Sequence, residues 1–497
     1  MTTKPALLAF LLVLLTFAQA VRLHEIRQPL VTFHPTRHYR SAVIARHCYY
    51  HADPTTPEWR VHVADANREM QPAGEPPFME WVACGVYLLA GHEDVAYPRS
   101  LVALTWVLGA IPLFLLARRW SSPSAALIGV TVYLFLPYAI VASRNFQPDA
   151  LMTLASLCAL VAVARLFERP TTGRQVLAIV LVALALVIKP MSVFLTIPVV
   201  LGLGILRGRD VPRASLPMVI VTVGLALLPA VLYYGYSTVF GSFAKDQMAM
   251  RFVPDLLTTT FFWGGLAKQI GRVFTMPLFV LSVAAIGLAP RWPMRVALAS
   301  LWIGYAAFAV AFTYHMPTHD YYHWPFISAV AFGVAAAVSR LEQVVSDRVR
   351  PATITAVAVA AAIVIAGAGT YAAWPRLSIA SADRIVASYR EIGELTEHHT
   401  NVLFLDLAYG YPLMYHGELS GDYWPTSDDL NAEAIGDQKP ISAAERFARD
   451  YEAFEPRYFV ATDLPSLTAQ PDLQELLKTH AVVVRQTPTY HVYKFID

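Results

Sequence analysis

Long apolar runs alternate with short polar stretches over most of the chain. A first apolar run is followed by a long polar loop, roughly residues 23–98, and then by a nearly unbroken series of further runs. Runs of this kind favour membrane-spanning helices, because about 17 to 25 apolar residues cross the hydrocarbon core of a bilayer. We therefore predict about eleven transmembrane helices, at about residues 6–21, 101–117, 125–142, 150–164, 176–188, 191–206, 216–236, 276–288, 296–313, 324–338 and 352–373.

The first run has two interpretations. Ala18-Gln19-Ala20 resembles a signal-peptide cleavage site. We favour a retained first helix, because Lys4 is the only basic residue before the run and many spans follow.

The basic residues lie mainly in alternate loops. This pattern predicts a cytoplasmic N-terminus, because cytoplasmic loops are enriched in Lys and Arg. The alternation holds only if the apolar residues 78–90 do not cross, so we predict an interfacial helix there. The outer face then holds the long first loop, SRNFQPD (143–149), Lys189-Pro190, the loop from Ser237 to about Thr275, and HMPTHDYYHWP (315–325).

The composition changes after residue 373. Segments 401–408, 457–462, 480–487 and 490–496 have strand-like patterns, and segments 382–398, 443–451 and 472–480 have helical ones. We predict a transmembrane module at 1–373, containing the first loop, and a small α/β domain at 374–497 on the outer face. The fold class is thus an all-α polytopic membrane protein with interfacial helices and this added domain.

The composition agrees with a membrane protein. Of the 497 residues, 56% are hydrophobic and only 15% are charged, whereas soluble domains carry about 25% charged residues. The net charge of +2 indicates no particular partner, and we expect no nucleic acid. Cys48, Cys84 and Cys158 lack metal-ligand spacing, so we predict small core residues at all three positions.

Four basic side chains form a candidate anion site on the outer face: Arg37, Arg40, Arg144 and Lys189. Lys189 is on the side where lysine is less expected, which favours a bound anion, and the natural ligand is a phosphate or pyrophosphate on a lipid carrier. An interfacial anchor is the plainer interpretation of Lys189. For Arg144 and Asp149, the plainer interpretation is that Arg144 snorkels towards the membrane surface while Asp149 caps a helix.

Two other segments carry candidate chemistry. Glu75 precedes Pro76-Pro77, which fixes the backbone beside it, although an exposed loop glutamate is the alternative. The segment 315–325 contains three histidines at four-residue spacing, but Pro317 and Pro325 favour an aromatic interfacial loop over a metal site.

Taken in order, these motifs resemble GT-C glycosyltransferases, in the bacterial branch related to lipid A aminoarabinose transferases and protein O-mannosyltransferases. GEPPFMEW (74–81) matches a Pro-Pro and Trp motif, and SRNFQPD matches a motif that ends in Asp. IKP (188–190) and THDYYHWPF (318–326) match later motifs, and Arg99 resembles an arginine that opens the second span. The resemblance covers about residues 5–340.

The resemblance implies an enzyme of the bacterial inner membrane. Such enzymes take a sugar from a polyprenyl-phosphate donor and pass it, with inversion, to a lipid, glycan or protein acceptor at the periplasmic face. We expect no cofactor, and the need for a divalent metal is left open.

Two departures from the family pattern concern the catalytic base. His34-Pro35-Thr36-Arg37 replaces an Asp-Glu pair, and Glu75 replaces a lysine. The expected site residues are Glu75, Asp149 or else His34 for the base; Arg37, Arg40, Arg144 and Lys189 for the donor phosphate; and Trp81, His319, Asp320, Tyr321 and Tyr322 for the substrate. We expect a working enzyme; the alternatives are lost activity with lipid binding alone, or a transporter or flippase of lipid-linked sugars.

Overall fold

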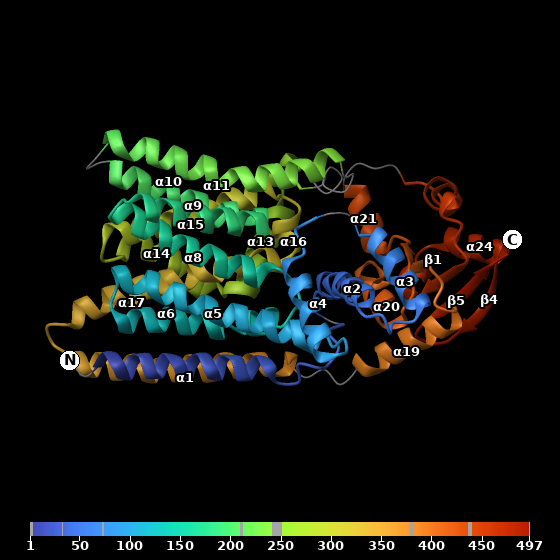
Figure 1. The fold of residues 1–497 in the computed structure, drawn as a ribbon, viewed down its shortest axis with the longest axis horizontal. Helices are drawn as coiled ribbons and strands as arrows, with labels where there is room; N and C mark the ends of the chain where they lie inside the picture. The colour runs from blue at the N-terminus through green and yellow to red at the C-terminus, as the bar shows by residue number, and fades with distance from the viewer. Residues whose placement is uncertain are drawn as a thin grey trace.

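The computed structural model describes residues 3–31, 33–71, 74–208, 212–240, 251–377, 382–435 and 440–496. Long helices form a bundle, and a sheet domain lies at one end of it (Figure 1). The N-terminus lies at the far end of the bundle, and the C-terminus lies in the sheet domain.

Each predicted apolar run lies in the bundle helices. These helices are α1 (Thr3–Leu23), α5 (Ala96–Trp120), α6 (Pro123–Phe135), α7 (Pro137–Ala142), α8 (Asp149–Glu168), α9 (Thr172–Ile188), α10 (Val193–Gly208), α11 (Pro212–Phe240), α13 (Thr260–Phe274), α14 (Met276–Leu288), α15 (Trp292–Ala311), α17 (Ile327–Val345) and α18 (Pro351–Ala373). Among the described residues, eight helical segments are long and apolar enough to cross a membrane, or nine if the bent pair α13–α14 is one span.

The structure corrects two of the predicted segments. The run 125–142 is not one helix, because Pro137 interrupts it and starts α7 after the extended Leu136. Part of the predicted outer loop between residues 237 and 275 is helix α13, which meets α14 at an angle of 93°.

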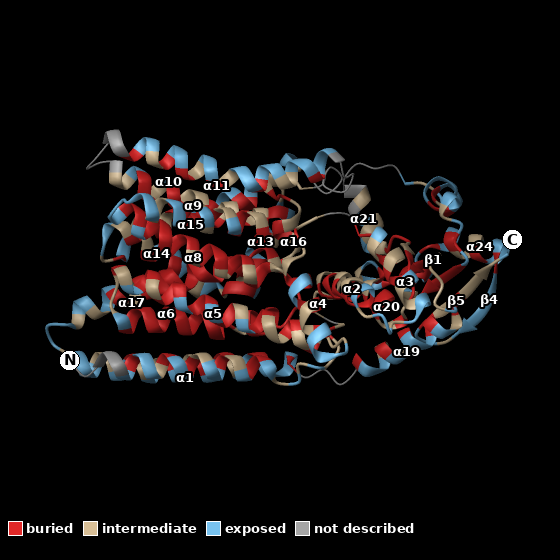
Figure 2. Ribbon diagram, in the orientation of Figure 1, coloured by how far each residue is buried: buried red, intermediate tan, exposed pale blue. Residues whose placement is uncertain are grey.

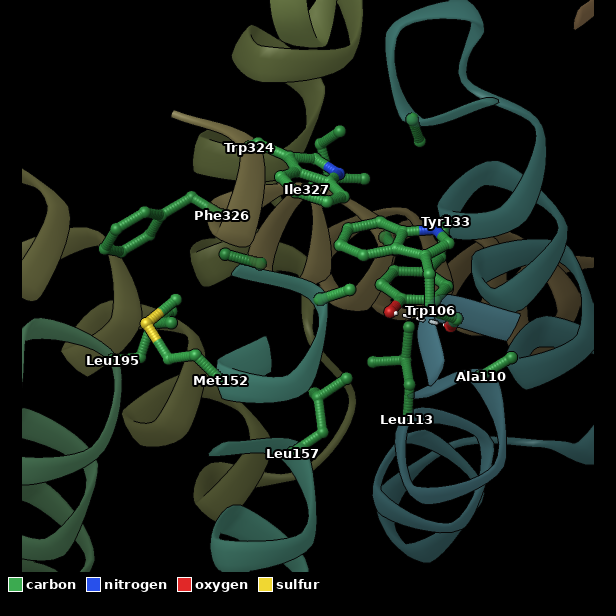
Figure 3. Close-up of a cluster of buried hydrophobic side chains, with 14 of the residues drawn as sticks. Trp106, Ala110, Leu113, Tyr133, Met152, Leu157, Leu195, Trp324, Phe326 and Ile327 are labelled. Carbon is green, nitrogen blue, oxygen red and sulfur yellow. Dashed lines mark hydrogen bonds between the residues drawn. The ribbon is translucent and has the colours of Figure 1, made fainter. Parts of the chain in front are cut away.

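The centre of the bundle is tightly packed. Most residues of α5, α8 and α17 are buried, whereas α11 presents exposed apolar side chains on its outer side (Figure 2). In the core, the ring of Trp106 stacks on Tyr133 at 4.3 Å and on Trp324 at 4.8 Å (Figure 3). Exposed apolar side chains on peripheral helices suit a lipid environment.

The long loop contains three helices, α2 (Pro35–Ala52), α3 (Glu58–Glu69) and α4 (Phe78–Ala90), which lie between the bundle and the sheet domain (Figure 1). At a rise of 1.5 Å per residue, the 13 residues of α4 span about 20 Å, less than the hydrocarbon core. This length agrees with the interfacial helix predicted there.

A disulfide contradicts the prediction that all three cysteines are small core residues. Cys48 of α2 and Cys84 of α4 are bonded, while Cys158 of α8 is free and half-buried. The packing of α2 on α4 brings Cys48 and Cys84 together, and their separation of 36 residues gives no sign of it.

The sheet domain follows α18. Its strand order is β2-β1-β3-β5-β4, with β2 (Gly421–Tyr423), β1 (Val402–Leu405) and β3 (Tyr458–Ala461) parallel, and β5 (His491–Phe495) antiparallel to both β3 and β4 (Ala481–Gln486). Helices α19 (Ala382–Leu395) and α20 (Tyr411–Gly417) cover one face, and α24 (Pro471–His480) covers the other. The short helices α21 (Ser427–Ile435), α22 (Ala443–Arg446) and α23 (Leu464–Thr468) complete the domain. All four predicted strands are present; β2 was not predicted.

Candidate active site

Four charged side chains form a chain of ion pairs where the bundle meets the outer helices. The Lys189 ammonium lies 2.8 Å from both carboxylate oxygens of Asp149. It also lies 3.9 Å from Oε1 of Glu75, whose Oε2 lies 3.3 Å from Nη1 of Arg37. Lys189 and Asp149 are buried. The structure thus brings together four of the predicted site residues from four separate segments.

Local sequence explains where these side chains lie. Lys189 ends α9 in an extended conformation, as expected of a residue before proline. Asp149 is the first residue of α8, where the helix dipole favours a carboxylate. Arg37 lies in the first turn of α2, and Glu75 precedes the two prolines that lead into α4.

The ionic centre borders two hollows: Asp149 and Lys189 line one, and Arg37 and Glu75 line the other. On the bundle side, an apolar cleft of about 270 Å³, including open space, is lined by Asp149, Lys189, Met152, Met191, Leu195, Phe308, Tyr321, Tyr322, Pro325 and Phe326. Figure 3 shows Met152, Leu195 and Phe326 beside the aromatic core. On the other side, a polar pocket of about 570 Å³, including open space, is lined by Arg37, Arg40, Ser41, Ile44, Arg68, Gly74, Glu75, Pro76, Pro77, Glu80, Pro148 and Tyr233.

The two carboxyl groups of the polar pocket have opposite electrostatics. Burial raises the pKa of Glu75, but Arg37, Lys189 and Arg40 outweigh it and lower that pKa to about 2. Burial raises the pKa of Glu80, although this carboxylate accepts a hydrogen bond of 2.5 Å from the Ser41 hydroxyl. Glu75 is therefore a stable anion at neutral pH, whereas Glu80 holds a proton more readily.

Sequence reasoning did not select Glu80 or Arg68. Both residues belong to helices of the first loop, and only the packing of α2, α3 and α4 shows that they share a pocket with Glu75. The sequence offered one signal for Glu80. It follows Pro77 by three residues, which puts it in the first turn of α4.

A histidine and an aspartate from distant segments also meet close to Tyr321, which lines the apolar cleft. His34 Nε2 lies 2.5 Å from Oδ1 of Asp320. The same Oδ1 accepts a hydrogen bond from the Tyr138 hydroxyl at 2.8 Å, and Nε of Arg272 lies 2.9 Å from Oδ2. His34 has a φ of 47°, in the left-handed region that is uncommon for residues other than glycine. Asp320 is thus the carboxylate that contacts the His34 imidazole.

The other residues of segment 315–325, here called the late loop, lie around His34 and Asp320. The Tyr321 ring lies 5.2 Å from the His34 ring, and Tyr321 and Tyr322 line the apolar cleft. His319 stacks on His315 at 5.3 Å, and burial lowers the pKa of His319 to about 4, so its imidazole is neutral at pH 7.

Two predicted site residues lie elsewhere. The guanidinium of Arg144 donates to the backbone carbonyls of His24, at 2.5 Å, and Leu377, at 3.3 Å. It therefore ties together the segments after α1 and α18, outside the chain of ion pairs. Trp81 is 57% exposed on α4 and lines neither hollow. Arg40 does line the polar pocket, where its Nε donates to Gln71 at 3.1 Å.

Comparison with known proteins shows which family and which solved structures this chain resembles. Residues 74–234 match the family described as dolichyl-phosphate-mannose-protein mannosyltransferase. No curated protein matches the chain in sequence.

Solved structures resemble the chain over nearly its whole length. ArnT from Cupriavidus metallidurans, bound to undecaprenyl phosphate, has a TM-score of 0.61 and 16% identity, covering 99% of this chain and 98% of its own. The archaeal oligosaccharyltransferase AglB from Archaeoglobus fulgidus, in complex with an inhibitory peptide and a dolichol-phosphate, has a TM-score of 0.54 and 13% identity, covering 100% of this chain and 75% of its own. The chain therefore has the fold of the GT-C glycosyltransferases, the superfamily that its motifs predicted.

Proposed function

We propose that this protein is a membrane glycosyltransferase that moves a sugar from a polyprenyl-phosphate donor to a lipid, glycan or protein acceptor. The observation that carries the proposal is the buried cation Lys189, which lines the apolar cleft and lies 3.9 Å from Glu75 of the polar pocket. A polyprenyl phosphate needs this combination, because it joins an apolar tail to an anionic head. ArnT, with the same fold, is known bound to undecaprenyl phosphate.

The donor extends from the apolar cleft to the polar pocket, past Lys189 and Glu75. Its tail contacts Met152, Met191 and Leu195, and its phosphate meets Lys189 and the arginines Arg37 and Arg40. These cations stabilise the charge that develops on the phosphate as the bond to the sugar breaks. Arg144 acts as a scaffold here, because its donors are bonded to carbonyls.

His34 is the base in this proposal. Among the three candidates, Glu75 and Asp149 already neutralise Arg37 and Lys189, whereas His34 is oriented by the carboxylate of Asp320. A carboxylate that fixes an imidazole is a recurring arrangement for a general base. His34 accepts the acceptor hydroxyl proton, the oxygen bonds to the anomeric carbon from the opposite face, and polyprenyl phosphate leaves with the bonding electrons.

The reaction takes place at the periplasmic face. The site, the sheet domain and the Cys48–Cys84 disulfide share one end of the bundle, and disulfides persist in oxidising compartments. The opposite end carries basic loops, where Arg119 pairs with Glu168 and Arg291 donates to the carbonyl of Arg119. This distribution follows the positive-inside rule.

Transfer of labelled sugar from polyprenyl-phosphate donors by the purified protein tests the proposal. We expect His34→Ala to lower kcat by about 10² to 10⁴-fold, the usual contribution of a general base. Glu75→Gln and Asp149→Asn should mainly raise KM for the donor, because they release the cations from their fixed positions. His92→Ala and Glu69→Gln, at exposed positions, are the matched controls.

Two results would contradict the proposal. If the wild type is active and all three site variants keep its rate, the catalytic residues are not those proposed here. Movement of lipid-linked sugar across vesicle membranes, with no transfer to any acceptor, would instead identify a flippase.

A further inference from the structure

A second cluster of polar side chains lies toward the far end of α2 from Arg37. His47 and His51 are one turn apart on α2, so their rings lie on the same face, 4.6 Å from each other. Asp65 of α3 faces both rings. Its Oδ1 lies 3.1 Å from Nε2 of His47 and 2.5 Å from Nε2 of His51. None of the three lines the hollows of the candidate active site.

The chemistry of this cluster is that of a transition-metal site. Two imidazole nitrogens and a carboxylate oxygen are ligands that Zn²⁺ prefers, and three protein ligands leave a position for water. In a tetrahedral zinc site with bonds of about 2.0 to 2.1 Å, ligand atoms lie roughly 3.3 Å apart. Here the three ligand atoms lie within 4.8 Å of one another, so small side-chain rotations complete the geometry.

The surroundings allow a cation to enter and be held. The side chains of His47, His51 and Asp65 are 28%, 47% and 43% exposed, so an ion reaches them from solvent. A simple ion pair explains the arrangement less well, because Asp65 Oδ1 is shared by two imidazoles and two imidazolium ions would repel each other. In the described part of the chain, three ligands of this kind converge only here.

We propose that His47, His51 and Asp65 bind one divalent transition-metal ion of the Zn²⁺ type, which links α2 to α3. The ion has a structural role, because ten residues of helix, about 15 Å, separate His47 from Arg37. α2 carries Arg37 and Arg40, α3 carries Arg68, and the disulfide already joins α2 to α4. The metal adds a second connection, between α2 and α3, among the helices that frame the polar pocket. Its binding does not depend on the transfer reaction.

Metal binding by the full-length protein in detergent, purified with a tag free of histidine, tests this inference. After treatment with a chelator, the protein is titrated with Zn²⁺ by calorimetry, and with Co²⁺ by its visible absorption. We expect the wild type to bind one Zn²⁺ per chain at this site and to show the absorption of tetrahedral Co²⁺. The variant with both His47→Ala and His51→Ala should lose this ion, and Asp65→Asn should weaken its binding at least tenfold.

A variant with both His62→Ala and Glu69→Gln is the matched control, because these exposed α3 residues lie outside the cluster. It should bind like the wild type. Zn²⁺ should also raise the unfolding temperature of the wild type and the control, but not of the double-histidine variant.

Asp65→Asn keeps a side chain that can hydrogen-bond to the histidines, so it separates metal loss from misfolding; elution as a single species checks its fold. The proposal is overturned if the chelated wild type takes up no metal. It is equally overturned if the double-histidine variant binds Zn²⁺ with the same stoichiometry and affinity as the wild type.

Discussion

Lys189 is buried between two carboxylates, so its charge affects stability as well as binding. Lys189→Met leaves Asp149 buried without its cation, and we expect it to lower the free energy of unfolding by about 3 to 5 kcal/mol. The double variant Lys189→Met with Asp149→Leu removes both charges and should recover most of that loss. Denaturation in detergent measures both, with Lys268→Met at an exposed site of α13 as the control. A double variant no more stable than Lys189→Met would contradict this view of the pair.

Glu75 gives the site a distinct response to acid. Its pKa is about 2 in the folded protein against an ordinary value of 4.5, so its ion pairs stabilise the fold fully above pH 4.5. This stabilisation, about 3 kcal/mol, is lost as the pH falls from 4.5 towards 2. Glu75→Gln should therefore lower the unfolding temperature at pH 6 but have little effect near pH 2. A difference from wild type that stays constant between pH 6 and pH 2 would exclude this linkage.

At the residue scale, motif order and sidedness were enough to predict that some of the candidate residues lie close together. Arg37, Glu75, Asp149 and Lys189 lie close together, since each is at or near a helix end on the same side of the bundle. Sequence spacing could not show that His34 contacts Asp320, because most of the bundle lies between them in the chain.

Arg144 shows the limit of reasoning from residue type. An arginine on the outer face binds an anion or a backbone carbonyl, and only the position of the segments after α1 and α18 decides between them.

At the element scale, close helix packing depends on a few small residues. A Cβ at Gly369 of α18 would overlap the carbonyl oxygen of Phe135 in α6, whereas a Cβ at Gly367 would meet nothing within 4 Å. Small residues allow helix backbones to approach in membranes. We expect Gly369→Val to destabilise the protein by about 1 to 3 kcal/mol or more, the usual cost of overpacking. Gly367→Val carries the same change of helix propensity and should unfold like the wild type; equal unfolding temperatures for the two variants would contradict the close contact.

Apolar length and periodicity predicted the bundle helices and four strands, but not the elements with weaker patterns. Helix α13 contains Gly264, Gly265, Lys268 and Arg272, which resemble a polar loop, and it is stabilised by packing against the late loop. Strand β2 has three residues, too few for an alternating pattern to be recognised. Such elements form because of their tertiary neighbours, which no local window of sequence contains.

At the scale of the whole molecule, α2 connects the helices of the first loop to the sheet domain. Its first turns carry Arg37 and Arg40, and Cys48 binds it to α4. Arg46 pairs with Glu93 at 2.6 Å and donates to the carbonyl of Tyr415 in the sheet domain, also at 2.6 Å. The sheet domain thus buttresses the helix that positions the arginines of the polar pocket, which gives the C-terminal residues a part in shaping the site.

The orientation of the whole molecule in the membrane is the remaining prediction. Basic loops lie at one end of the bundle, and the disulfide and sheet domain lie at the other, so we expect the former in the cytoplasm and the latter in the periplasm. Single cysteines at the exposed positions Ser346 and Thr489, in a Cys158→Ala background, report the two ends. A membrane-impermeant maleimide should label Thr489→Cys in intact spheroplasts and Ser346→Cys only after lysis. Labelling of both in lysed cells shows that each site is accessible. Labelling of Ser346→Cys alone in intact spheroplasts would reverse the orientation and place the disulfide in a reducing compartment, which would overturn the periplasmic assignment of the reaction.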